Sequence, residues 1–161
     1  MAFEWELKEG LTPCSDVVIA SPTAKFGLPE ALRGIYAGAG GLPRLIRNCG
    51  LHIASEIAMT GRQLTAEEAV KYHLANKVSR SQDTVVDEAV EMASKMANIS
   101  PDAIIVTRAA LREAWETASV ERAFELTDQR FKRALMSGEN SKEGLAAFAE
   151  KRAPRWKPSK L

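Results

Sequence analysis

The sequence is poor in the features that mark several classes of protein. Aromatic residues make up only 6% of its 161 residues, which leaves few side chains for stacking on the bases of a single-stranded nucleic acid. The net charge is +1, so charge does not favour nucleic acid or an anionic membrane surface as a partner. No apolar run reaches the roughly 18 residues that a membrane span needs. We therefore expect no nucleic-acid partner and no membrane span.

Metal-binding and disulfide patterns are missing as well. Cys14 and Cys49 form no C-x-x-C pair, and His52 and His73 have no ligand-like neighbours, so we expect no metal site. Free thiols in a reducing compartment are the simplest interpretation of this cysteine usage. The first ten residues, MAFEWELKEG, are acidic and do not resemble a secretory signal. The composition is 45% hydrophobic and 27% charged, as expected for one globular domain with a moderate core.

Candidate strands are few, and they fall in the first third of the chain. Residues 15–21, SDVVIAS, form a short β-branched run between turn residues and predict a strand. The alternating FEWEL at residues 3–7 could supply a partner strand. An apolar strand needs neighbours in a sheet. The shortage of strands suggests that part of the fold is missing or that a partner chain completes it.

Helical patterns fill the remainder of the sequence. A proline start and a glycine stop predict one helical turn over PEALRG, residues 29–34. Thr65, followed three residues later by Glu68, predicts a capping box. We also expect helices with N-caps at Ser100 and Ser141. The other segments expected to be helical are residues 42–50, 51–61, 83–100 and 119–139, with a brief strand at 77–79.

One stretch combines backbone freedom with a single acid. Residues 24–45, AKFGLPEALRGIYAGAGGLPRL, contain five glycines and one carboxylate, Glu30. The glycines could bind an anion at a helix start, pack backbone against backbone, or leave a flat slot beside Glu30 for a thin ligand. Their spacing matches neither G-x-G-x-x-G nor a P-loop. Glu30 stands among apolar residues, where a carboxyl group can exchange protons near neutral pH; a solvated glutamate at a turn is the alternative.

Short motifs follow one another in a specific order along the chain. Asp16 precedes A-x-F-G-x-P-E at residues 24–30, G-x-x-x-G-A-G-G at 34–41 and R-L at 44–45. This order resembles the enoyl-CoA hydratase/isomerase (crotonase) superfamily. TGRQLTAEEAVKYHLANKV is similar to the family's T-G-x-x-x-x-A-x-E-A-x-x-x-G-L-V, with His73 where a glycine is common. EGLAAFAEKRAPRW resembles the family's closing segment. The resemblance covers residues 15–158.

The resemblance implies an α/β fold that is mostly helical in this chain. It corresponds to the C-terminal part of a crotonase ββα spiral, followed by a C-terminal helical trimerisation region. We accordingly expect an atypical segment at residues 1–14, the spiral core at 15–82, the helical region at 83–156 and a targeting tail at 157–161. Family chains are longer, so this chain matches only their C-terminal part.

The resemblance also implies chemistry on acyl-CoA thioesters. Members of the family stabilise an enolate with two backbone N–H groups, and glutamates move the proton. Glu30 matches a catalytic glutamate in F-G-x-P-E. The substrate-binding residues implied in this way are Gly38, Phe26, Leu28, Phe148 and Lys151. Phe148 and Lys151 would lie near the CoA nucleotide, with helix packing and solvation as their alternative roles. CoA arrives as part of the substrate, so no metal or redox cofactor is expected.

Departures from the family pattern leave more than one function open. The family's oxyanion donors precede Asp16, one of them in a G-G-G-x-E motif, and no such glycines occur between Met1 and Cys14. Glu9 could replace that motif's glutamate only if the alignment slips by one residue. The chain could be an enzyme that hydrates a 2-enoyl-CoA or shifts an enoyl-CoA double bond. It could instead be an inactive assembly partner, or a helical interaction module in which the setting of Glu30 is incidental.

The sequence closes with Ser159, Lys160 and Leu161. A C-terminal S-K-L is a peroxisomal address read by an import receptor, and a frayed surface terminus is the alternative. The preceding RAPRWKP is basic and contains proline, which should leave the tail exposed. We expect a peroxisomal protein that forms a homo-trimer or hexamer. Its chemistry would serve fatty-acid oxidation or CoA-linked secondary metabolism.

Overall fold

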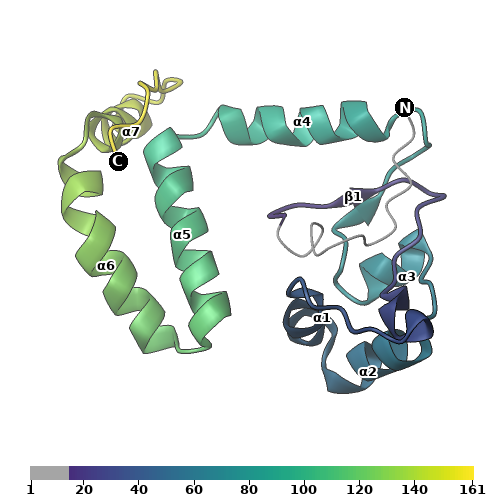
Figure 1. Cartoon of the computed structure of the whole chain (residues 1–161). Helices are drawn as coiled ribbons and strands as arrows, with labels where there is room; N and C mark the ends of the chain where they lie inside the picture. The colour runs from purple at the N-terminus through teal and green to yellow at the C-terminus, as the bar shows by residue number, and fades with distance from the viewer. Residues whose placement is uncertain (1–14) are drawn as a thin grey trace. The chain divides into compact units, whose positions relative to one another are not determined.

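The computed structural model describes residues 15–161 (Figure 1). The chain divides into two compact units, residues 1–90 and 91–161, and each is considered by itself. The strand predicted at residues 3–7 and the segment at 1–14 lie outside the described residues.

The first unit contains a small parallel pair of strands. β1 (Ile19–Ala20) pairs with β2 (Lys77–Val78), which confirms the brief strand expected near residue 77. β1 is shorter than the predicted 15–21, because its described partner offers only two residues for pairing. An antiparallel bridge joins Phe26 to Leu64 through two backbone hydrogen bonds of 3.1 and 2.6 Å.

Four short helical segments connect these strands. They are the 3-10 helix η2 (Pro29–Arg33), α1 (Gly41–Cys49), α2 (Leu51–Thr60) and α3 (Ala66–Lys71). The predicted capping box at the start of α3 is confirmed. The Thr65 hydroxyl accepts a hydrogen bond from the Glu68 N–H, and the Glu68 carboxylate accepts one from the Thr65 N–H, at 3.2 and 2.9 Å.

An apolar core holds the first unit together. Leu64 and Ile57 are its largest fully buried side chains, and Phe26 and Leu28 are buried with them. Gly41 lies against this core, because a Cβ built on it would be 3.4 Å from a methyl of Leu28. Close packing of backbone is therefore the observed role of this glycine.

Helix α4 (Val85–Ala97) begins in the first unit, where Glu88 fixes its first turn. The buried Glu88 carboxylate accepts hydrogen bonds from the Arg80 N–H at 2.8 Å and the Thr84 hydroxyl at 3.0 Å, and it pairs with Lys77. The Lys77 hydrogen bond is the main reason why the pKa of Glu88 is lowered to about 2. The carboxylate therefore ties α4 to β2.

The second unit is a set of helices. α5 (Pro101–Thr117) and α6 (Val120–Ser137) lie side by side in Figure 1, and α7 (Glu139–Ala149) follows. The Ser100 hydroxyl caps α5 by accepting from the Ala103 N–H at 3.4 Å, as predicted. The predicted Ser141 cap is wrong, because α7 begins at Glu139 and the Ser141 hydroxyl instead donates to backbone carbonyls of Met136 and Gly138.

Within the second unit, a network of polar side chains fixes the segment that follows α7. Asn140, only 3% exposed, donates to the Lys157 carbonyl at 2.9 Å and accepts from the Lys157 N–H at 2.8 Å. Its amide also donates to the buried Asp102 carboxylate at 2.9 Å. The Trp156 indole N–H donates to the Asn98 carbonyl at 2.9 Å. The segment after α7 is therefore fixed by directed hydrogen bonds.

Candidate active site

Glu30 presents a buried carboxylate oxygen on the short helix η2. The residue is half-buried, and its Oε2 has no hydrogen-bond partner among residues 15–161. Its backbone carbonyl accepts from the Ile35 N–H at 3.2 Å, which fixes the turn that follows. Buried polar atoms in proteins are nearly always paired. A buried carboxylate oxygen without a partner marks Glu30 as a candidate for proton transfer.

Exposed apolar side chains follow Glu30 directly. Leu32, Ile35 and Tyr36 all present large side chains outside the core. Leu32 covers Gly61, since a Cβ on that glycine would be 2.6 Å from the Leu32 Cγ. The segment that follows Glu30 therefore presents large apolar side chains at the surface.

The glycines at 38 and 40 lie at the start of α1. Gly38 is exposed, whereas Gly40 adopts a left-handed conformation, with φ 83°, as the N-cap of α1. The Arg44 side chain folds back over Gly40 and donates from Nη1 to its carbonyl at 3.1 Å. A Cβ on Gly40 would lie 2.2 Å from that nitrogen, which is the mobile end of a long side chain, so the left-handed φ is the reason why glycine is favoured here.

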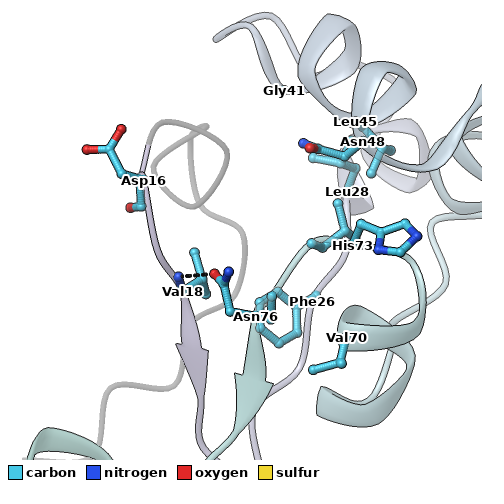
Figure 2. A pocket seen from close by; sticks show the side chains of 13 residues that line it. Asp16, Val18, Phe26, Leu28, Gly41, Leu45, Asn48, Val70, His73 and Asn76 are labelled. Atoms are coloured by element: carbon cyan, nitrogen blue, oxygen red, sulfur yellow. Dashed lines mark hydrogen bonds between the residues drawn. The ribbon is translucent and has the colours of Figure 1, made fainter. Parts of the chain in front are cut away.

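A separate cavity of about 530 Å³ lies in the first unit. Phe26 and Leu28 line it, whereas Glu30 and Gly38 are not among its lining residues. Figure 2 shows Leu28 on one side of the cavity and Asn76 on the other, where the Val18 N–H donates to Asn76 Oδ1 at 2.7 Å. The structure thus places Phe26 and Leu28 in the same unit as Glu30 but facing a different space. Their substrate-binding role stays a prediction.

His73 also lines this cavity, in the position where the family pattern commonly has glycine. Its φ is 61°, in the left-handed region that glycine adopts without strain and that histidine rarely adopts. The backbone therefore keeps the conformation that the family motif implies, even though the residue differs.

Phe148 and Lys151 belong to the second unit. Phe148 is 86% exposed near the end of α7, and Lys151 is exposed beyond it with a φ of 53°. The Lys151 N–H donates to the Phe148 carbonyl at 3.2 Å. These two residues therefore lie together and are open to a partner, and their contact with CoA stays a prediction.

The terminal S-K-L is partly exposed, and its lysine forms an ion pair with Glu139. The Lys157 and Lys160 ammonium groups each lie 2.5 Å from the Glu139 carboxylate and lower its pKa to about 2. The Leu161 N–H donates to the Ser159 hydroxyl at 3.1 Å. Lys160 and Leu161 remain exposed, so the tail is accessible although its lysine has an ionic partner. Its role as an address stays a prediction.

Tyr36 lies on the turn that follows Glu30 and is not part of the motifs. Its position lies between Gly34 and Gly38 and has no fixed letter in the pattern. The sequence signal that could have drawn attention to Tyr36 is a large aromatic residue in a glycine-rich turn. Such a turn offers few buried positions for a large side chain.

The part of the chain from residue 15 onward contains no group of three His, Cys, Asp or Glu side chains placed to hold a metal ion. None of its helices is long and apolar enough to cross a membrane.

The motifs, the helical fold and the setting of Glu30 agree with one class of protein. The chain belongs to the enoyl-CoA hydratase/isomerase family, whose sequence profile matches residues 9–159. The crystal structure of an enoyl-CoA hydratase from Mycobacterium tuberculosis superposes with a TM-score of 0.84 at 34% identity. The match covers 92% of this chain and 58% of that one. The predicted family and the predicted partial crotonase fold are confirmed.

Three of the curated relatives are named hydratases, and others, at 36–37% identity, are named carnitinyl-CoA dehydratases. A mevalonyl-coenzyme A hydratase of Aspergillus fumigatus is 46% identical over 146 residues, which is 91% of this chain and 54% of the relative. A 2,3-dehydroadipyl-CoA hydratase of Escherichia coli is 39% identical over 142 residues, 88% of this chain and 54% of the relative. The chain spans about half the length of the curated relatives it matches.

Proposed function

We propose that this protein acts in hydratase-type chemistry on an acyl-CoA thioester, with Glu30 as the general acid/base. The observation that carries this proposal is the buried, unpaired Oε2 of Glu30 within F-G-x-P-E. Membership of the family and the hydratase relatives support it.

The chemistry needs one group that handles a proton beside the thioester. Hydration of a 2-enoyl-CoA adds the oxygen of water to C3 and a proton to C2. Glu30 would deliver the proton to C2 and regain one from the water that is deprotonated as it adds to C3. A double-bond shift would use the same carboxyl group to remove a proton from one carbon and return it to another. Hydration, or its reverse, is favoured because relatives at 46% and 39% identity are named hydratases and others are named dehydratases. CoA enters only as part of the substrate, with no metal or redox cofactor.

The acyl chain proposed first is short and carries a polar substituent. A mevalonyl-coenzyme A hydratase is a relative at 46% identity, which makes mevalonyl-CoA a candidate substrate or product. This choice fits CoA-linked secondary metabolism, with fatty-acid oxidation as the alternative pathway. The S-K-L tail supports import into the peroxisome by a receptor that reads the C-terminus.

A second candidate function is that of an inactive subunit. It is favoured by the lack of a G-G-G-x-E motif in the residues ahead of Asp16, since that motif supplies a family oxyanion donor. Exposed apolar side chains on α5, α6 and α7, such as Leu111, Phe124 and Leu145, support assembly with other chains. A homo-trimer or hexamer is the proposed assembly for either function.

Turnover of crotonyl-CoA, followed by loss of the enoyl thioester absorbance, tests the proposal. We expect Glu30→Gln to lower the rate by about a hundredfold or more, because general acid/base catalysis contributes on that scale. Glu67→Gln, which changes an exposed glutamate of the same unit, is the control and should retain the rate. Circular dichroism should show both variants folded.

Two results would reject the proposed function. A folded wild type without turnover of any enoyl-CoA would favour the inactive subunit. A rate that Glu30→Gln leaves unchanged would remove Glu30 from the mechanism.

A further inference from the structure

The Tyr36 side chain lies beside Gly38 and outside the core. It is 76% exposed. A Cβ built on Gly38 would lie 3.3 Å from the Tyr36 Cζ and 3.4 Å from its phenol oxygen. The polar end of the ring therefore lies directly over the backbone of Gly38, and the absence of a side chain at that glycine leaves room for it.

The Tyr36 hydroxyl makes no hydrogen bond to any residue between 15 and 161. The other tyrosine of the chain, Tyr72, differs in that it is half-buried against the core of the first unit. A phenol can donate and accept a hydrogen bond while its ring contacts apolar groups. An exposed ring with an unused hydroxyl is therefore suited to a ligand that has both apolar and hydroxyl groups.

The turn that carries Tyr36 is the one that carries Glu30. The Ile35 N–H, one residue before Tyr36, donates to the Glu30 carbonyl at 3.2 Å. On the other side Ala37 is buried in the core, which fixes the backbone after Tyr36. A short, hydrogen-bonded segment therefore connects the carboxyl group to the phenol.

We propose that Tyr36 determines substrate specificity by hydrogen-bonding a hydroxyl group on the acyl chain, beyond the reacting carbons. This inference rests on the proposed acyl-CoA chemistry at Glu30. The substrate class is a short hydroxyacyl-CoA thioester. A hydroxyl suits a phenol because each can both donate and accept, whereas a carboxylate only accepts and is better matched by a guanidinium.

Equilibrium binding of a matched ligand pair tests the inference. The pair is mevalonyl-CoA and 3-hydroxy-3-methylpentanoyl-CoA, which lacks only the terminal hydroxyl. Calorimetry would compare the wild type, Tyr36→Phe and the control Tyr72→Phe. We expect Tyr36→Phe to weaken mevalonyl-CoA binding by about three- to tenfold, the scale of one neutral hydrogen bond, and to leave the other ligand unaffected. Tyr72→Phe should preserve both affinities.

The outcomes separate this inference from the proposed reaction. If Tyr36→Phe removes the preference for the terminal hydroxyl while no variant turns over an enoyl-CoA, the inference stands and the proposed reaction fails. If turnover is present but the wild type and Tyr36→Phe have the same affinity ratio, the reaction stands and the inference is overturned. Absence of binding for both ligands also overturns it.

Discussion

The two units of this chain bury different kinds of residue. In the first unit, alanine, leucine, isoleucine and phenylalanine side chains form a continuous core between residues 20 and 75. In the second unit, the polar side chains of Ser100, Asp102 and Asn140 are buried, together with those of two alanines. Large apolar side chains such as Leu145 stay exposed there. Apolar residues therefore form most of the buried set in the first unit, which also buries Ser79 and Glu88, whereas polar residues form most of it in the second.

The two units also differ in what they offer to other molecules. Glu30 lies on the unit that has its own core, so its turn is fixed by contacts within that unit. The second unit presents apolar helix surfaces, and such surfaces commonly mark interactions with other proteins. The proposed roles divide in the same way, with proton transfer at Glu30 in the first unit and assembly through α5, α6 and α7 in the second.

Truncation of a core leucine should give the largest effect. Leu64, with 0% exposure, loses both apolar burial and close contacts in Leu64→Ala, so we expect the free energy of unfolding to fall by about 2–5 kcal/mol. The matched control Leu145→Ala removes the same atoms from a side chain that is 66% exposed, and its effect should stay within about 0.5 kcal/mol. Urea unfolding measures both. Equal losses would contradict the contrast between the units.

Removal of the Asn140 amide should give the next largest effect. Asn140→Ala leaves the Asp102 carboxylate and the backbone of Lys157 without their partner, so we expect a loss of about 1–3 kcal/mol. Amide hydrogen exchange at residues 153–161 should accelerate. Asn98→Ala is the control, because it preserves the carbonyl that accepts from Trp156. Unchanged exchange in Asn140→Ala would show that other contacts fix the tail.

The smallest expected effect is a pH dependence that involves Glu88. Its pKa is lowered from 4.5 to about 2, chiefly by the hydrogen bond from Lys77. A carboxyl group with a lower pKa in the folded state stabilises the fold above its unfolded pKa, and this contribution is lost as the pH falls through the folded pKa. The stability difference between the wild type and Glu88→Gln should therefore shrink as the pH decreases from about 5 to 2.

Urea midpoints across this pH range, with Glu125→Gln as an exposed control, measure the Glu88 contribution. A difference that does not change with pH would assign the stabilisation to packing rather than to the charge. The pKa values of Glu139 and Glu143 are also lowered to about 2, so these residues add an acid-sensitive contribution to the stability of the second unit. This contribution is the same in the wild type and in Glu88→Gln, so it cancels in the comparison.

Local chemistry was the predictable part of the fold. The capping box of Thr65 and Glu68, the Ser100 cap and the single turn at Pro29–Arg33 all follow from neighbouring residues. The motif order predicted the family and placed Glu30 among apolar residues. Each of these predictions depends on spacing within a few residues or on a motif along the chain.

Features that depend on distant partners were not predictable. Ser141 precedes an apolar helix and looks like a cap, but Gly138 and Glu139 extend the helix backward. Asn140 looks like a solvated residue, and only the return of Lys157 to its side explains why it is buried. The position of the Tyr36 ring over Gly38 is likewise not predicted by any periodicity.

The measurement that tests the central claim most directly is solvent-deuterium exchange at C2 of butyryl-CoA, followed by mass spectrometry. This substrate has no double bond to hydrate, so exchange reports proton transfer alone. If Glu30 handles the proton, the wild type incorporates deuterium, Glu67→Gln does so at the same rate, and Glu30→Gln loses the exchange. Equal incorporation by the wild type and Glu30→Gln would contradict the account.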